Sequence, residues 1–427
     1  MMALQYGNES YQVRLLQYGL KRAGIEPGNI DGIFGRRTLR AVQQFQRAMG
    51  LAADGIAGKL TWGALYPYIV GYTLHRIAAG DTFYALAQRF DTSIEAIRIA
   101  NPTLTAEALP IGAVVTVPLD LPVVTGELPA SSLLVGMQVK GLAMRYPFLQ
   151  SYEIGRSGMG RRIQAVSLGN GEKQIGYNAS HHANEWITTL VLLRFLEEYA
   201  SAAARGGTVW GVSAKELFSG TTLHMVPLVN PDGVDLVTGT LDPDDSYYAQ
   251  AKALSSFYPE IPFPEGWKSN IAGVDLNLQY PAEWQSARRI KFSQGFTRPG
   301  PRDYVGDAPL IAPESRAMAK WTRERDFSLT ISYHTQGKII YWQYGNIVVP
   351  GAQQIATAFS KSSGYLMEDV PYASSFAGYK DWFIQTWRRP GFTIEAGIGK
   401  NPLPLSLFDE IYRNNLPILV QGLTLSP

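Results

Sequence analysis

The chain has no cysteine and few histidines. Of its 427 residues none is cysteine and five are histidine. The lack of cysteine excludes disulfide bonds, thiolate nucleophiles and cysteine-ligated zinc or iron–sulfur clusters. Any bound metal must therefore be held by imidazole and carboxylate groups, and few imidazoles are available.

Long apolar runs and an excess of one charge are also missing. The formal net charge is only +2, and no segment shows the basic stripe that binding to a phosphate backbone requires. No run approaches the roughly 18 apolar residues of a membrane span, and the first residues lack the charged and apolar regions of a signal peptide. We therefore expect no nucleic-acid partner, no membrane insertion and no visible export signal.

Length and composition predict a folded protein of several domains. The apolar fraction is 46% and the charged fraction 17%, which is typical of globular chains. Single hydrophobic cores stop growing at roughly 250 to 300 residues, so this chain is too long for one.

An internal repeat marks residues 1–70. DGIFGRRT at 31–38 is echoed by DGIAGKLT at 54–61, each after a segment with apolar residues at helical spacing. Glycines between helices allow turns with positive φ. The pattern predicts a small all-α module and closely resembles the peptidoglycan-binding module of wall hydrolases. A generic three-helix domain that binds protein is the alternative.

Residues 71–119 predict a second small module of strand, two helices and strand. YTLHRI and AVVTVP are strand-like, and caps are expected at Asp81 or Thr82 and at Thr92 or Ser93. GDTFYALAQRF, IEAI, NP and VTVP give this βααβ unit its resemblance to LysM domains, which bind glycans containing N-acetylglucosamine. The proline-containing stretch 120–130 has little periodicity and predicts a linker.

Residues 131–427 alternate between strand-like and helix-like segments, which predicts one α/β domain. We expect a mixed, largely parallel sheet flanked by helices, with functional residues at strand ends. The strand candidates are KQIGYNA (173–179), TTLHMVPLVN (221–230), LTISYHT (329–335), IIYWQYG (339–345) and GFTIEAG (391–397).

The stretch SHHANEW offers a candidate metal site. His182 and Glu185 lie three residues apart at the predicted start of a helix, so both side chains can reach one zinc ion, whereas His181 has the wrong spacing. Zinc hydrolases keep three protein ligands and leave one position open. His334, where an apolar strand stops, is the favoured third ligand over His224, which lies inside a strand.

Six ordered motifs in residues 131–427 resemble the zinc carboxypeptidase superfamily: IGRSGMGRRI, the HxxEW of SHHANEW, LVNPDGV, VDLNLQYP, the SYH of ISYHTQG, and GFTIEAG. The resemblance implies one Zn²⁺ per chain, with His182, Glu185 and His334 as ligands. It makes Glu395 the general base on a zinc-bound water.

The same resemblance suggests roles for residues around the zinc. Lys268 stands where the family usually has an arginine facing the oxyanion, and Tyr372 matches a mobile catalytic tyrosine only if one residue is inserted, so Tyr379 remains an alternative. Asp275 is implied as an acceptor that orients a ligand histidine, although a plain turn after a strand would also explain it. His181 is expected to flank the site or to pack.

Two departures affect substrate binding. Carboxypeptidases carry V-D-x-N-R-N, whose arginine clamps the substrate's C-terminal carboxylate, but here Asn277 is followed by Leu278. Leucine cannot pair with a carboxylate. Asn184 likewise replaces the arginine of the HxxREW form. Asn277, Asn184 and Lys380, the last near the position lining the S1′ pocket, are the expected substrate-binding residues.

Two wall-binding modules before such a domain raise the concentration of peptidoglycan near the site. The architecture resembles the γ-D-glutamyl-meso-diaminopimelate peptidases of spore-forming bacteria. This implies a zinc peptidase that acts on stem peptides, with glycan strands as partners, at the cell wall or spore or in recycling of wall fragments. The alternatives are a metallocarboxypeptidase of ordinary peptides, a deacylase of small amides, and an inactive wall-binding adaptor.

Overall fold

The computed structural model describes residues 2–105 and 109–426. Its contacts divide the chain into two compact units, which are described separately: Met1–Leu128 with Gly136–Gln150, and Pro129–Val135 with Ser151–Pro427. The domain boundaries expected at residues 70, 119 and 130 stay a prediction.

The first unit begins with three helices followed by a two-stranded sheet. Its elements are α1 (Tyr11–Arg22), α2 (Arg36–Ala48), α3 (Lys59–Val70), β1 (Tyr72–Arg76), α4 (Phe83–Arg89), α5 (Ile94–Ala100) and β2 (Val114–Pro118). Strands β1 and β2 pair antiparallel, with Leu74 opposite Thr116. The all-α and βααβ modules expected from the sequence are therefore confirmed.

The first copy of the repeat is built around one buried amide. The Gln17 amide nitrogen donates to the Asp31 carboxylate at 2.9 Å, the Ile33 carbonyl at 3.1 Å and the Thr38 hydroxyl at 3.1 Å. Its oxygen accepts from the backbone N–H of Gly32 at 2.9 Å, where φ is +85°. Every polar atom of the amide is satisfied, so the turn is held in one conformation.

The second copy repeats this arrangement. The Gln46 amide nitrogen donates to Asp54 at 2.8 Å and to Thr61 at 3.1 Å, and its oxygen accepts from the Gly55 N–H at 2.9 Å. The duplicated sequence is thus a duplicated hydrogen-bond network that fixes each turn before a helix.

Side-chain caps set the helix starts in the βααβ module. The Thr82 hydroxyl accepts from the N–H of Ala85, and the Ser93 hydroxyl from the N–H of Ala96, both at 3.0 Å. The structure therefore selects Thr82 and Ser93 from the two pairs of capping candidates. Asp81 instead contacts His75 at 2.7 Å.

The predicted linker 120–130 contains no helix or strand, yet it is packed. Val123, Val124 and Leu128 are buried, and Glu127 pairs with Lys21. Helix α6 (Ser132–Arg145) follows and has residues in both units.

The second unit contains one large sheet and its covering helices. The strands of the large sheet are β3 (Gln150–Arg156), β4 (Arg162–Gly169), β5 (Lys173–Ala179), β8 (Thr221–Val226), β9 (Phe327–His334), β10 (Ile339–Tyr341), β11 (Leu366–Glu368) and β12 (Gly391–Glu395), and a small sheet pairs β6 (Thr208–Val209) with β7 (Val212–Ser213). The α-helices are α7 (Ile187–Arg205), α8 (Ala214–Gly220), α9 (Pro231–Val237), α10 (Ser246–Ser255), α11 (Trp284–Ser293), α12 (Pro313–Arg323), α13 (Ala352–Ser363), α14 (Tyr379–Trp387) and α15 (Phe408–Thr424). The 3₁₀ turns are η1 (Ala183–Glu185), η2 (Leu276–Leu278), η3 (Tyr372–Ser374) and η4 (Leu405–Leu407).

The large sheet runs in the order β11-β10-β12-β9-β5-β8-β4-β3. Its centre is parallel, because β5 pairs in parallel with β8 and β9, and β9 with β12. Antiparallel pairs join β10 to β12 and β4 to β8. The predicted mixed, largely parallel sheet is therefore confirmed, and its parallel centre brings the ends of β5, β9 and β12 to one edge.

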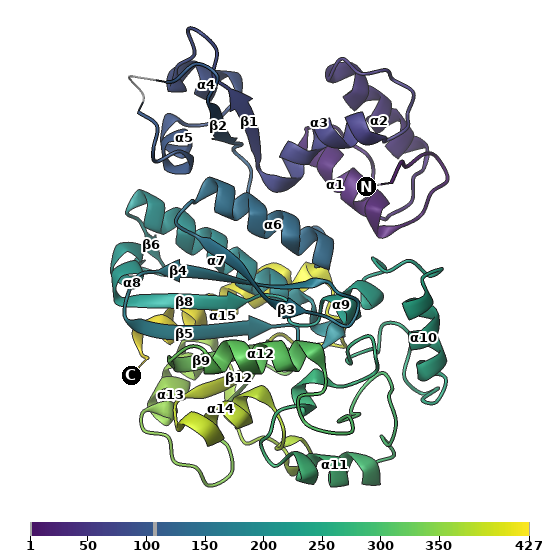
Figure 1. The fold of residues 1–427 in the computed structure, drawn as a ribbon, viewed down its shortest axis with the longest axis vertical. Coiled ribbons are helices and arrows are strands. Elements are labelled where there is room, and N and C mark those ends of the chain that lie inside the picture. Colours follow the sequence, from purple (N-terminus) through teal and green to yellow (C-terminus); the bar gives the residue numbers. More distant parts are fainter. Residues whose placement is uncertain (1, 106–108, 427) are drawn as a thin grey trace. The chain divides into compact units, whose positions relative to one another are not determined.

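Helices cover both faces of this sheet (Figure 1). Helix α15 packs where Gly422 comes against Tyr177 and Ile331, and the Tyr177 hydroxyl donates to the Leu419 carbonyl at 2.7 Å. Helix α14 packs against Gly391 on the other face. Gly391 pairs with Thr330 of β9, and Thr330 faces the opposite side of the sheet from its neighbour Ile331. None of the helices in the described part of the chain is long and apolar enough to cross a membrane.

Replacing Gln17 by leucine should loosen the first turn of the repeat. The N–H of Gly32 and the oxygens around the amide would lose buried partners, at a cost of about 1–3 kcal/mol. Hydrogen exchange of the full chain should show amides of residues 28–38 exchanging about 5- to 150-fold faster, the factor that this cost corresponds to. Gln44→Leu, at an exposed position of α2, is the control; equal protection in both variants would contradict the role of the amide.

Candidate metal centre

His182 and Glu185 stand on a short turn directly after β5. Ser180 takes a positive φ of 53°, and the turn closes through the Glu185 N–H, which donates to the His182 carbonyl at 3.3 Å. The Thr188 hydroxyl donates to the Glu185 carbonyl at 2.7 Å, at the start of α7. The predicted helical turn is therefore a 3₁₀ turn, which places both side chains on one side.

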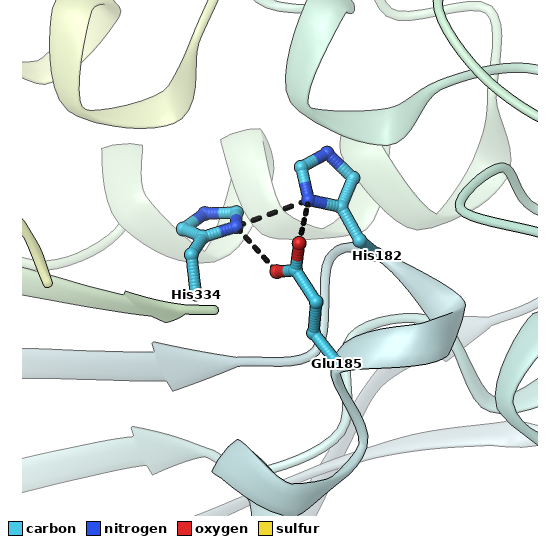
Figure 2. A group of neighbouring side chains, drawn as sticks. All are labelled: His182, Glu185 and His334. Atoms are coloured by element: carbon cyan, nitrogen blue, oxygen red, sulfur yellow. Dashed lines mark hydrogen bonds and ion pairs between the residues drawn. The ribbon is translucent and has the colours of Figure 1, made fainter. Parts of the chain in front are cut away.

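His334 reaches the same place from β9. The parallel pairing of β5 with β9 sets Ala179 opposite Tyr333, so the strands end together. The nearest contacts are 3.0 Å from His182 Nδ1 to Glu185 Oε1 and 2.9 Å from His334 Nδ1 to Glu185 Oε2. Figure 2 shows the carboxylate between the two imidazoles.

The three side chains fit a metal ion. Their donor atoms all lie within 4.8 Å of one another, and the two Nδ1 atoms are 3.1 Å apart. Donors at about 2.0–2.2 Å from one zinc ion lie about 3.3 Å apart in a tetrahedral shell. A cation bound among these donors would offset the close approach of the two imidazole nitrogens to each other and to the carboxylate.

The electrostatics of the cluster also favour a cation. Burial opposes the charged carboxylate of Glu185, but His182, Lys268 and His334 hold its pKa well below its usual range. Burial likewise disfavours charge on His182, yet Glu185 and Asp275 raise its pKa to about 9. The cluster therefore attracts a positive charge, which a metal ion supplies more strongly than a proton.

Asp275 and Lys268 surround the ligands. Asp275 Oδ1 lies 3.1 Å from His182 Nε2, the nitrogen that faces away from Glu185, and fixes the orientation of the ring. The Lys268 ammonium lies 3.2 Å from Glu185 Oε1. The structure thus places both predicted residues beside the cluster.

Glu395 ends β12 directly beside His334. The register of the parallel strands pairs these two residues. Burial and the nearby Glu185 raise the pKa of Glu395 to about 8, although Lys268 and His182 oppose the shift. Positive charge bound at the cluster would lower this pKa and favour the carboxylate form.

A cavity of about 240 Å³ opens over the cluster. Among its lining residues the sequence predicted His182, His334, Glu395, Lys268, Asp275, Asn277 and Lys380. Sequence reasoning missed Lys291, Arg302, Asp303, Tyr341, Asp381 and Thr393, which also line it. Thr393 could have been predicted from the sequence, because it lies two residues before Glu395 and therefore on the same face of β12. The long connection that contributes Arg302 and Asp303 carries no periodic pattern.

The predicted substrate-binding residues occupy different places. The Asn277 side-chain oxygen accepts from the Tyr379 N–H at 3.0 Å, and the buried Lys380 ammonium contacts Asp381 and the Gln343 carbonyl, each at 2.6 Å. Asn184 is buried outside the cavity lining, and its amide donates to the Glu265 carbonyl at 3.3 Å.

The predicted catalytic tyrosine is exposed. The Tyr372 side chain is 74% exposed and its ring contacts Phe376, while its neighbours Pro371 and Ser374 line the cavity. The alternative, Tyr379, is buried and its hydroxyl contacts Thr322 at 2.8 Å. The roles of Tyr372 and Asn184 stay predictions.

The remaining histidines of this unit have packing contacts. His181 is buried, with Nε2 2.9 Å from the Tyr280 hydroxyl, and burial holds its pKa well below the usual range. His224 lies inside β8, where Gln174 at 2.7 Å and Tyr152 at 3.1 Å bind its two nitrogens.

Asn230 and Asp232 of LVNPDGV hold segments around the site together through hydrogen bonds. The Asn230 amide donates to the carbonyls of His181 at 3.1 Å and Ser269 at 3.0 Å. It thereby ties the turn before His182 to the segment that carries Lys268. Asp232 accepts from Ser157 at 2.8 Å and Arg161 at 3.0 Å, which fastens IGRSGMGRRI to α9.

Comparison with known families identifies the class of this fold and site. A family model described as zinc carboxypeptidase matches residues 137–416, one for a putative peptidoglycan binding domain matches 9–65, and one for the LysM domain matches 75–118. The chain therefore belongs to the zinc carboxypeptidase family and is a zinc metallopeptidase that carries wall-binding domains.

Two curated relatives and one solved structure are similar to this chain. The chain is 47% identical over 287 residues to gamma-D-glutamyl-L-diamino acid endopeptidase 1 of Lysinibacillus sphaericus, covering 67% of this chain and 70% of that protein. It is 38% identical over 291 residues to the protein YqgT of Bacillus subtilis, covering 68% and 76%. The fold resembles bovine thrombin-activatable fibrinolysis inhibitor with a TM-score of 0.55 at 17% identity, covering 70% and 97%.

His334→Ala should abolish tight zinc binding, because it removes one of three ligands. Elemental analysis of the purified protein should give about one zinc per chain before the change and almost none after it. His224→Gln is the matched control and should keep its zinc. Loss of zinc from the His224 variant alone would contradict the ligand set.

Asp275→Asn should weaken zinc binding about 10- to 100-fold, because the neutral amide no longer raises the basicity of His182. Competition with a chromophoric chelator measures this affinity. Asp307→Asn, at an exposed carboxylate that binds the Tyr304 hydroxyl, should leave it unchanged. An equal affinity in all three proteins would exclude an orienting role for Asp275.

Proposed function

We propose that the protein hydrolyses the bond between the γ-carbonyl of D-glutamate and meso-diaminopimelate in peptidoglycan stem peptides. The observation that carries the proposal is Leu278 on the cavity wall beside the ligand cluster. An apolar side chain there leaves a C-terminal carboxylate without the arginine that carboxypeptidases use. The name of the Lysinibacillus relative, a gamma-D-glutamyl-L-diamino acid endopeptidase, supports the same kind of bond.

The charge of the cavity suits a substrate with several carboxylates. Its wall carries four cationic and four carboxylate side chains, namely Lys268, Lys291, Arg302 and Lys380 against Asp275, Asp303, Asp381 and Glu395. A divalent ion held with one further carboxylate, Glu185, leaves a positive surplus. Stem peptides bear free carboxylates that such a site attracts.

The chemistry is divided among a few residues. A bound zinc ion supplies a Lewis acid that polarises a carbonyl and lowers the pKa of water. Glu395 takes the proton of the attacking water and delivers it to the leaving amine. Lys268 donates to the oxygen that becomes negative, as a point charge without the fork of an arginine. His182, Glu185 and His334 would hold the ion, and Asp275 would orient His182.

The cavity wall carries a pair of opposite charges that matches the carboxylate and amino group of the leaving diaminopimelate. Lys380 and Asp381 lie side by side on the cavity wall, 2.6 Å apart and buried. In the proposed complex Lys380 pairs with a carboxylate of diaminopimelate and Asn277 contacts its backbone. Asp381 offers a partner for the amino group beside that carboxylate.

The wall-binding domains suggest the location. They associate the chain with the cell wall, and tethering raises the concentration of stem peptides at the site. An enzyme that acts on stem peptides would work at the wall or spore, outside the cytoplasmic membrane, or in the recycling of wall fragments.

Glu395→Gln should retain zinc but lose activity by about 10²- to 10⁴-fold, because the amide cannot accept the proton. The substrate is L-Ala-γ-D-Glu-meso-diaminopimelate, and mass spectrometry should find free diaminopimelate released by the unaltered enzyme. Peptides with an α-linked C-terminal lysine or leucine are the comparison. Preferential release of those residues would replace the proposal with ordinary carboxypeptidase activity, and zinc binding without cleavage of any peptide would point to another amide.

A further inference from the structure

Arg302 is an unassigned cationic group on the wall of the active-site cavity. Its side chain is 44% exposed, and its Nε donates to Asp303 Oδ2. Its two terminal nitrogens have no hydrogen-bond partner among residues 2–105 and 109–426. One edge of the guanidinium is therefore held by the protein while the other is available to a ligand.

The segment that carries Arg302 is fixed on both sides. The Pro301 carbonyl accepts from the N–H groups of Lys268 at 2.7 Å and Ser269 at 3.0 Å. On the other side, the N–H of Asp303 donates to Asp275 Oδ2 at 3.2 Å. Arg302 thus lies between Pro301, which is hydrogen-bonded to the Lys268 segment, and Asp303, which is hydrogen-bonded to Asp275.

Asp303 is itself held in an unusual conformation. Its φ is +63°, which non-glycine residues rarely adopt. Its other oxygen, Oδ1, accepts from the buried Lys291 ammonium at 2.6 Å. Two cations therefore share this carboxylate, so Asp303 orients the guanidinium without neutralising the pair. The arrangement keeps a planar, partly free guanidinium beside the reacting groups, a geometry suited to carboxylate.

We propose that Arg302 binds a carboxylate of the substrate and replaces the arginine that is absent at Leu278. This inference rests on the proposed function. A γ-linked glutamyl residue keeps a free α-carboxylate near the scissile bond, which an α-linked peptide lacks, and the diamino acid carries carboxylates of its own. Arg302 contributes to specificity by contacting one of these groups.

The test measures binding to the zinc-loaded Glu395→Gln protein, in which the ligand stays intact. The ligands are γ-D-Glu-meso-diaminopimelate, its form with a carboxamide on glutamate, and its forms with a carboxamide on either end of diaminopimelate. Calorimetry gives each dissociation constant with Arg302 present and with Arg302→Gln. Arg298→Gln is the matched control, because Arg298 lies on the same connection, is exposed and rests over the Phe257 ring.

With Arg302 present, amidation of the carboxylate that it binds should weaken binding about 10- to 100-fold. In R302Q the same amidation should change the affinity less than about twofold, because the glutamine side chain carries no charge that would favour the carboxylate over the carboxamide. R302K, which keeps the positive charge but not the planar fork, should retain part of the discrimination. The ligand whose amidation loses its effect in R302Q identifies the carboxylate. Equal ratios of acid to amide affinity in both proteins for every ligand, or no binding of the dipeptide, would overturn the proposal.

Cleavage by the unaltered enzyme separates this inference from the proposed function. Discrimination that depends on Arg302, found without cleavage of the γ-linked substrate, would refute the reaction and keep the contact. Cleavage with Arg302-independent discrimination would refute the contact and keep the reaction. Zinc content equal to that of the parent protein confirms that R302Q has not disturbed the ligand cluster.

Discussion

Burying Glu185 is the constraint on which the active centre depends. This carboxylate is almost fully enclosed, and an ionised group without partners in such a place would cost several kcal/mol. Two imidazoles and the ammonium of Lys268 lie around it, and a bound metal ion would complete the compensation. The partners come from separate segments, so the sheet must bring strand ends together before the charge can be tolerated.

Residues that do no chemistry meet this requirement. Asn230 joins the turn before His182 to the Lys268 segment, and Asp275 links His182 to the connection that carries Arg302. Gln279 braces that connection further along, because its side-chain oxygen accepts from the N–H groups of Ile311 and Ala312. A ligand cluster held in this way needs little rearrangement to bind its ion, which favours both affinity and catalysis.

Leu278 stands where the zinc carboxypeptidase family has an arginine, and the segments around it carry the other residues of the cavity wall. Leucine at this position offers no partner for a carboxylate, while the neighbouring Gln279 holds the connection beyond Asp303 through Ile311 and Ala312. The wall keeps its cations on other segments, at Arg302 on the connection before α12 and at Lys380 on α14. In the proposed complex the contacts to substrate carboxylates therefore lie on segments other than that of Leu278, while His334 and Glu395 stand at strand ends.

Hydrophobic periodicity and turn residues in the sequence were enough to predict β5, β9 and β12. His182 and His334 could be found at their ends, because parallel strands bring their carboxyl ends to one edge. Glu395 was predicted from the resemblance of GFTIEAG to the zinc carboxypeptidase superfamily. The rest of the cavity wall could not be predicted in this way, since Arg302 and Asp303 lie on a connection whose path is set by long-range hydrogen bonds. The burial of Asn184 and the exposure of Tyr372 also follow from the folded chain alone. Local spacing fixes which side chains a turn presents, whereas contacts distant in sequence decide which connection closes over them.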